Sequence, residues 1–319
     1  MIRPFSLRDA LIVRHLQTRG AAFDFKRCLL STQNPTRSAV LGLVSGHYIG
    51  ARTLVHTGIQ GSDPVAFVQL LPREDGSSWD VVCIAPTLDE GAEVACLWQD
   101  MLSQAIITAA QQGVARIYAR TPLYGDTTMV LRRSGFTVVG CEEVFASFAT
   151  QAAVPMPAGL RPVADEDVWG LSELRRQVIP PLVYQAQWFA PEEVTSSAQA
   201  MGAAQGGYVW IDNGLIVAHM SLDSTARGHW IECTVRPERR GDLLPYLRYL
   251  LYVANGADHR PVYVSVPDYA VGLGWLLRTL GFESYGRQQV MVAHTVSRVT
   301  VSRPAVAHGL EGRVDIVAH

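Results

Sequence analysis

Apolar residues in the second half of the chain follow the spacing of strands around one turn signal. The runs YVWID (208–212) and LIVAHMSLD (215–223) flank the dipeptide Asn213-Gly214. Asn-Gly favours the positive φ angles of a two-residue turn, so this pattern predicts a β-hairpin. A third apolar run, HWIECTV (229–235), predicts the strand that follows.

A different spacing begins after this strand and predicts helices that pack on a sheet. The apolar stripe at helical spacing consists of Leu243, Leu244, Leu247, Leu250, Leu251 and Ala254. Such a stripe must face other apolar groups. The run VYVSV (262–266) predicts a buried strand, and a helix over about 270–280 should end at Gly281. The run VMVAHTV (290–296) predicts a last strand.

The first half of the chain shows the same order of elements. Strand SWDVVCIA (78–85) precedes a helix, strand RIYAR (116–120) precedes a helix that stops at Gly135, and VVGCEEVFASFA (138–149) predicts a final strand. The stripe of the first of these helices is Val94, Leu97, Trp98, Met101, Leu102 and Ala105. In the second half, Asp165 is the expected cap of an additional helix over 167–177.

Four segments of the first half recur in the second half in the same order. The pairs are IRPFSLRD (2–9) with LRPVADED (160–167), SWDVVCIAP (78–86) with HWIECTVRP (229–237), RIYARTP (116–122) with VYVSVP (262–267), and LRRSGF (131–136) with LRTLGF (277–282). A period this long is unsuited to a solenoid and indicates two copies of one domain. The alternative is one large domain that contains a coincidental repeat.

The repeat places the domain boundaries. We predict a first domain at 1–147, a linker at 148–159, a second domain at 160–298 and a tail at 299–319 without an assigned role. The linker, FATQAAVPMPAG, carries two prolines, a glycine and small residues that interrupt any periodicity.

Composition narrows the class of protein. A chain of 319 residues with 48% hydrophobic residues is long enough to bury the cores of two domains. A formal net charge of −2 predicts neither a nucleic-acid nor an acidic-membrane partner. The five cysteines and nine histidines have no metal-site spacing, and no apolar run approaches the roughly 20 residues of a membrane span. We expect a cytoplasmic protein without a metal, of unpredicted oligomeric state. Lys26 is the sole lysine, and the sequence suggests no role for it.

The duplicated order of elements, the RP…D opening, the Arg-Gly turn and the GF-terminated helices resemble a tandem GNAT acyltransferase. The resemblance covers nearly all of both copies. It implies an α+β fold made of two tandem GNAT-like domains, each a mostly antiparallel twisted sheet flanked by helices. In the family, a strand ending V-x-P leads into a turn patterned Q/R-x-x-G-x-G/A. The N–H groups of that turn receive the pyrophosphate of acetyl-CoA.

The resemblance implies a cofactor site in the second copy, because its turn keeps part of the family pattern. Val235, Pro237, Arg240 and Gly241 match, whereas Leu243 and Pro245 stand where the family has small residues. The implied cofactor-binding residues are Val235, Arg240, Gly241, Asp242 and Leu243. In the first copy, Asp89, Glu90 and Glu93 lie where phosphates would bind, so like charges predict that this copy does not bind CoA. Those acids also suit an ordinary helix N-terminus.

The resemblance implies one candidate catalytic residue, Glu232, as a proton acceptor on the strand before the turn. An acid on the solvent face of a half-exposed strand is the alternative. The tyrosine that often serves the family as an acid is replaced by Leu277 and Leu131, so no general acid is inherited. Tyr263, Tyr269 and Tyr285 lie nearby in sequence.

Three further residues are candidates for substrate binding. His219 lies on the hairpin, where a structural role is the alternative. Tyr184 and Trp188 belong to VIPPLVYQAQWFAPEE (178–193), where the family places a substrate-covering loop. An inter-domain packing surface is equally consistent with these aromatic residues.

Two functions remain open. The first is N-acyl transfer by the second copy, with acetyl-CoA as co-substrate and a small-molecule or peptide amine as acceptor. The second is a non-catalytic ligand-sensing or interaction module on a degenerate tandem GNAT fold.

Overall fold

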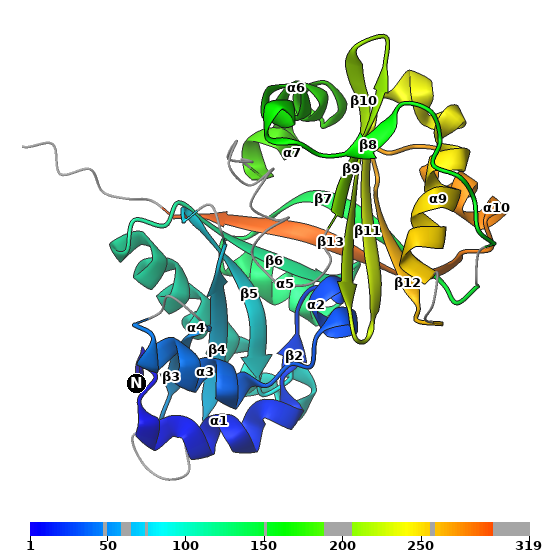
Figure 1. The fold of residues 1–319 in the computed structure, drawn as a ribbon. Coiled ribbons are helices and arrows are strands. Elements are labelled where there is room, and N and C mark those ends of the chain that lie inside the picture. Colours follow the sequence, from blue (N-terminus) through cyan, green and yellow to red (C-terminus); the bar gives the residue numbers. More distant parts are fainter. Residues whose placement is uncertain are drawn as a thin grey trace, which may run out of the picture.

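The computed structural model describes residues 1–46, 50–58, 65–73, 76–149, 152–187, 206–255 and 259–295. Trp188 and the tail at 299–319 lie outside the described residues. Secondary structure is dense throughout both halves of the described chain (Figure 1).

The N-terminal half begins and ends with a strand. Its elements are β1 (Ile2–Pro4), α1 (Ala10–Leu16), β2 (Ala21–Ala22), α2 (Phe25–Leu30), α3 (Pro35–Val44), β3 (Arg52–His56), β4 (Ala66–Pro72), β5 (Ser78–Ala85), α4 (Ala92–Gln111), β6 (Arg116–Pro122), α5 (Asp126–Arg133) and β7 (Thr137–Ser147). Three short 3-10 helices join them: η1 (Leu7–Asp9), η2 (Gln17–Arg19) and η3 (Leu88–Glu90).

The C-terminal half follows the same order, except that β2 and one of the early helices have no counterpart among its described residues. Its elements are β8 (Leu160–Pro162), η4 (Asp165–Asp167), α6 (Val168–Val178), α7 (Pro181–Gln187), β9 (Gly206–Asp212), β10 (Leu215–Thr225), β11 (Gly228–Val235), η5 (Pro237–Leu243), α9 (Leu244–Asn255), β12 (Val262–Pro267), α10 (Leu273–Thr279) and β13 (Glu283–His294). The mixed fold with a largely antiparallel sheet, predicted from the sequence, is confirmed.

The two halves share one sheet because they exchange their last strands. The described strands follow the order β1-β3-β4-β5-β6-β13-β7-β12-β11-β10-β9-β8, with β2 added to β5. Strand β13 therefore lies between β6 and β7, and β7 lies between β13 and β12. Figure 1 shows β13, in orange, running from the C-terminal half across to β6. The predicted boundaries at 147 and 160 stay a prediction, and the hydrogen bonding crosses them.

Helices cover both faces of the sheet. In the C-terminal half, α9 and α10 enclose a core with Leu243, Leu247, Leu250 and Leu277. In the N-terminal half, Trp98 and Met101 of α4 pack with Leu131 of α5. Helices α1 and α3 pack on the opposite face of this half, and α6 contacts β10 and β11. The residues of both predicted stripes are thus buried in these cores, except that Leu244 is partly buried against the core and Leu243 lies at the end of η5.

The duplicated RP…D segment is a structural device. Arg3 donates two hydrogen bonds to Asp9, at 2.6 and 2.7 Å, and Arg161 does the same to Asp167, at 2.7 Å each. Asp167 also accepts from the backbone N–H of Ala164 at 2.8 Å. The predicted cap Asp165 is therefore wrong: Asp167, whose side chain is buried, fixes the start of α6 because the bidentate arginine holds it in place.

The turns predicted from Asn-Gly and Gly are confirmed. Asn213 and Gly214 have φ angles of 50° and 77° between β9 and β10. Gly135 and Gly281 follow α5 and α10 with φ angles of 93° and 80°, the left-handed conformation that ends a helix. Among the described helices, none combines the length and apolar character needed to cross a bilayer.

We predict that the two halves unfold together, because each contributes a strand to the other. Met291 of β13 is fully buried in the core of the N-terminal half. Met291→Ala should lower the free energy of unfolding by about 2–5 kcal/mol and keep a single urea transition, followed by tryptophan fluorescence and far-UV circular dichroism. Val271→Ala, at an exposed residue, should change it by less than about 0.5 kcal/mol. Two separate transitions in the wild type would contradict the prediction.

Candidate functional site

Strands β11 and β12 are paired over only part of their length. The parallel pairing runs from His229 and Val262 to Glu232 and Ser265 and then stops. From Cys233 to Val235, no described strand pairs with the edge of β11 that faces β12. An unpaired strand edge presents free N–H and C=O groups that an extended ligand is able to use. We define the unpaired edges of 233–235 and 266–267 as the open slot of the C-terminal half, since no strand among the described residues fills it.

The N-terminal half has the same splay, but its own chain fills it. Pairing of β5 with β6 stops at Asp80 and Tyr118. Beyond that point β2 pairs with β5, with Ala21 opposite Ile84 and Ala22 opposite Cys83. The backbone of β2 occupies the slot in this half, so the slot has no room for a ligand.

Side-chain packing holds this inserted segment in place. The N–H groups of Phe23 and Asp24 donate to the carbonyls of Val82 (3.1 Å) and Arg120 (3.2 Å), on the two splayed strands. The Phe23 side chain is 1% exposed and packs 6.1 Å from the ring of Trp98. Removing the segment from the slot would expose this core residue, so we regard the slot as permanently closed.

The acidic turn after β5 agrees with this conclusion. A hollow of about 330 Å³ lies between η3, the start of α4 and α5, and Asp89 and Asp126 line it together with Arg133. Glu90 pairs with Arg19. The carboxylates disfavour a pyrophosphate here.

Glu232 lies at the point where β11 and β12 separate. It shares one face of the sheet with Trp230, whose Nε1 donates to its Oε1 at 2.9 Å. Lys26, from α2 of the other half, places its Nζ 3.1 Å from the same Oε1 and 2.6 Å from Oδ2 of Asp223. The candidate proton acceptor is thus already paired with a cation.

This pairing decides the protonation state of Glu232. The charge of Lys26 is the main reason that the pKa of Glu232 falls to about 2, and the hydrogen bonds from Lys26 and Trp230 act in the same direction. Since 52% of the side chain is exposed, water screens part of this attraction. A carboxylate with so low a pKa is a weak base while Lys26 stays beside it.

A larger polar network continues from Glu232 across the same face of the sheet. Its members come from both halves and are Asp80, Arg120, Glu142, Ser265 and Gln288. Glu142 accepts from Ser265 at 3.1 Å and from Gln288 at 3.0 Å. Because β7 and β13 are exchanged, the network exists only when both halves are folded together.

Two other titratable groups lie near Glu232. His219, on β10 opposite Thr234, lies on the same face, and burial with the nearby charge of Arg175 lowers its pKa to about 4. Burial and the charges of Glu142, Asp268 and Glu232 raise the pKa of Tyr269, so its hydroxyl stays protonated. Of the three nearby tyrosines, Tyr263 packs with Trp230 and Tyr285 with Phe25.

The turn after β11 has a regular, hydrogen-bonded backbone. Residues 237–243 form the 3-10 helix η5, whose N–H groups make internal i to i+3 bonds. Val235 and Leu243 are buried in the core, whereas Gly241 and Asp242 are exposed. A Cβ at Gly241 would meet nothing within 4 Å. The buried Nε of Arg240 has no hydrogen-bond partner among the described residues.

Solved structures with similar folds include GNAT proteins. A GCN5-related N-acetyltransferase from Sphaerobacter thermophilus matches 92% of this chain and 95% of its own, with a TM-score of 0.59 and 18% identity. A tandem GNAT protein from the clavulanic acid biosynthesis pathway matches 93% and 98%, with a TM-score of 0.52 and 15% identity. The chain has the GNAT fold. No protein-family model and no curated protein matches the sequence.

Within the GNAT fold, sequence reasoning missed two residues beside Glu232: Lys26, which comes from the other half, and Asp223, which lies on the neighbouring strand β10 of the same half. Lys26 and Asp223 both contact the Glu232 site, yet the sequence suggested no role for either. In the sequence, the pairing expected for the hairpin strands is the feature that points to Asp223. With Ser221 opposite Glu232, Asp223 shares the face of Glu232 one pair along. No local pattern identifies Lys26.

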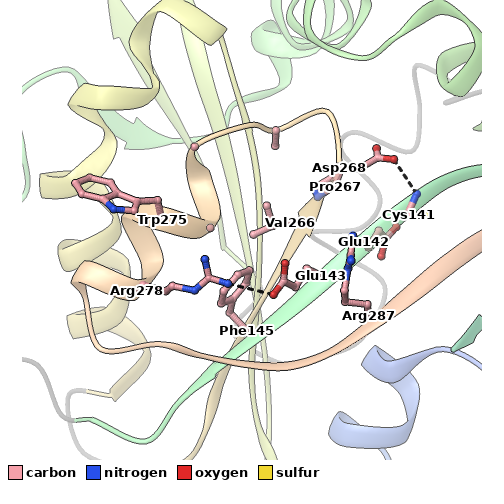
Figure 2. A pocket seen from close by; sticks show the side chains of 13 residues that line it. Cys141, Glu142, Glu143, Phe145, Val266, Pro267, Asp268, Trp275, Arg278 and Arg287 are labelled. Carbon is pink, nitrogen blue, oxygen red and sulfur yellow. Dashed lines mark hydrogen bonds and ion pairs between the residues drawn. The ribbon is translucent and has the colours of Figure 1, made fainter. Parts of the chain in front are cut away.

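The remaining candidate residues lie away from these contacts. Tyr184 is half-buried on α7, which packs on β7 and accepts a hydrogen bond from Tyr118 at the carbonyl of Ala186. A hollow of about 370 Å³ lies beside α10 and the end of β12. Figure 2 shows Arg278 on Glu143 and the N–H of Cys141 donating to Asp268. It lies between β12 and β7, on the other side of β12 from the open slot.

We predict a pH-dependent contribution of Glu232 to stability. Because the native pKa of Glu232 is lowered to about 2 from 4.5, its contribution is complete above about pH 4.5 and is lost as the pH falls toward 2. The difference in unfolding free energy between the wild type and Glu232→Gln should therefore shrink from about pH 5 down to about pH 3, measured by urea denaturation.

Lys26→Met provides the control for this series. In that background Glu232 has lost the charge that lowers its pKa, so adding Glu232→Gln should give a much weaker pH dependence. Equal slopes in both backgrounds would show that the Lys26 pair does not set the pKa.

Proposed function

We propose that the protein is an acyl-CoA-dependent N-acyltransferase and that its C-terminal half carries out the transfer, with an acetyl group as the expected acyl chain. One observation carries this proposal. The two halves have the same splayed strand pair, and the chain closes it in the N-terminal half with β2 but leaves β11 open in the described part of the C-terminal half. One closed slot and one open slot support a single acyl-CoA site per chain, in the C-terminal half.

The residues around the open slot fit an acyl-CoA. Free backbone groups of 233–235 suit the extended arm, and Gly241 leaves open space beside the turn. Since the N–H groups of η5 bond internally, Arg240 becomes the main candidate for a phosphate contact. Its Nη1 donates to the carbonyl of Val271 at 3.2 Å, so the contact would use the remaining exposed part of the guanidinium. Acyl-CoA would supply a thioester: the amine nitrogen forms the new C–N bond, the C–S bond breaks, and CoA leaves as the thiol.

The protein's own groups would bind the acceptor and move its proton. Glu232 and Asp223 present two carboxylates that attract an ammonium group, and Glu232 becomes a useful proton acceptor once Lys26 no longer pairs with it. His219 and the exposed part of Glu232 would line the acceptor side.

The non-catalytic alternative has its own support. The Lys26 pair neutralises Glu232, η5 replaces the family's open turn, and the buried Leu277 stands in the tyrosine place. These features are expected if the fold has kept a binding role without transfer. Binding of acetyl-CoA without release of CoA in the presence of amines would favour it.

We predict one acetyl-CoA site per chain, in the C-terminal half, by isothermal titration calorimetry. Gly241→Glu should weaken binding at least tenfold, about 1.4 kcal/mol, because it adds a carboxylate beside the phosphates without a steric clash. Gly241→Gln, of the same size without the charge, should bind nearly as the wild type does, as should Glu90→Gln in the closed half. No heat of binding at ligand concentrations on the order of millimolar would refute the proposal.

A further inference from the structure

Lys26 reaches the C-terminal site from the other half of the molecule. It is the chain's one lysine, carried by the short helix α2, which contacts β11. In Figure 1, α2 lies beside the lower end of the β10–β11 hairpin. Its Nζ lies 2.6 Å from Asp223 and 3.1 Å from Glu232. Two carboxylates from two strands thus converge on a single primary ammonium group.

The surrounding contacts anchor α2 firmly. The N–H of Phe25 donates to Gln288 of β13 at 3.1 Å, and the Phe25 ring packs edge-on against Tyr285 at 5.7 Å. At the other end of the helix, Arg227 donates to the carbonyl of Ser31 at 3.2 Å. Leu30 packs in a cluster with Trp230 and Tyr263. Because the helix is fixed on both sides of Lys26, the placement of its ammonium group is specific, unlike that of a freely moving surface lysine.

The Lys26 ammonium group lies at one end of the open slot. Glu232 is the last residue of β11 that pairs with β12, so the Lys26 ammonium lies where the slot begins. An acceptor amine must reach this same point to meet an acyl group held between the strands.

We propose that Lys26 occupies the acceptor position of the C-terminal site as a tethered ammonium, and that the external acceptor is a primary amine that takes its place between Glu232 and Asp223. This inference rests on the acyltransferase function proposed above. It names the substrate class, a primary amine, and a means of control, since the site accepts an external amine only when Lys26 withdraws.

Lys26 acts here as an occupant of the acceptor position. Burial alone would lower its pKa, but the charges of Glu232 and Asp223 outweigh that effect and raise the pKa above the ordinary lysine value. Lys26 therefore stays an ammonium while it lies between the two carboxylates. An external ammonium that takes its place meets the same two carboxylates, and its nitrogen attacks the thioester only after a proton passes to Glu232.

The first test is binding, measured as thermal stability. Lys26→Ala leaves a channel, the space vacated by the lysine side chain, that ends at two carboxylates, so n-butylammonium should raise its Tm by about 2 °C or more. 1-Butanol fills the same space without the charge and should not do so. Lys26→Met keeps the channel filled, and Lys26→Ala combined with Asp223→Asn and Glu232→Gln removes the charges, so neither variant should respond. Equal stabilisation by butanol and butylammonium would overturn the ammonium site.

The second test is transfer, measured as release of CoA from acetyl-CoA in the presence of n-butylamine. Lys26→Ala should have a kcat/KM for butylamine at least about tenfold above that of the wild type. A gain in Lys26→Ala has two possible causes, the release of Glu232 from its ion pair and the opening of the channel. Lys26→Met separates them, because it releases Glu232 without opening the channel. An equal gain in Lys26→Met would overturn the proposal, as would acetylation of Lys26 in the wild type, detected by mass spectrometry. If acetyl-CoA fails to bind while butylammonium still stabilises Lys26→Ala, the acyltransferase function fails and the ammonium site stands.

Discussion

The exchange of β7 and β13 between the two halves is the constraint on which the rest of the structure depends. Each strand completes the sheet of the half that did not supply it, so the two sheets become one and neither half has a full set of hydrogen bonds alone. Unpaired backbone groups in a buried sheet are costly, which ties the folding of each half to the other. The exchange also brings residues of both halves onto one face, where Glu142 joins Ser265 and Gln288.

The two copies of the fold differ in whether their splayed strand pair is filled. A few backbone residues make this difference. In the N-terminal half, Ala21 and Ala22 are small enough to run beside β5 as a strand, and Phe23 anchors them in the core. Close approach is part of this fit, since a Cβ at Gly20 would lie 2.8 Å from the Cys83 sulfur. In the C-terminal half, the corresponding edge of β11 has no such partner among the described residues. The difference in ligand capacity thus follows from main-chain pairing first and from side-chain charge second.

Most elements lie where the sequence patterns and the GNAT resemblance predicted them. The reason is that the patterns depend on residues that are close together in the chain. Periodic apolar stripes, Asn213-Gly214, Gly135 and Gly281 act over a few residues, so they are visible without tertiary structure. The RP…D repeat was also visible as a pattern, although its cap was assigned to Asp165 instead of Asp167. That error arose because the bidentate bond from Arg161 depends on geometry that spacing alone does not provide.

The sequence by itself determined the two copies, their order of strands and helices, and Glu232 as the acid on the strand before the turn. The tertiary structure alone decided what surrounds Glu232. Lys26 is 206 residues away along the chain, β2 lies about 60 residues from the strand it closes, and β13 pairs with strands of the other half. Local preferences act over one or two turns of chain, whereas ion pairs and strand insertion depend on which surfaces the completed fold brings together.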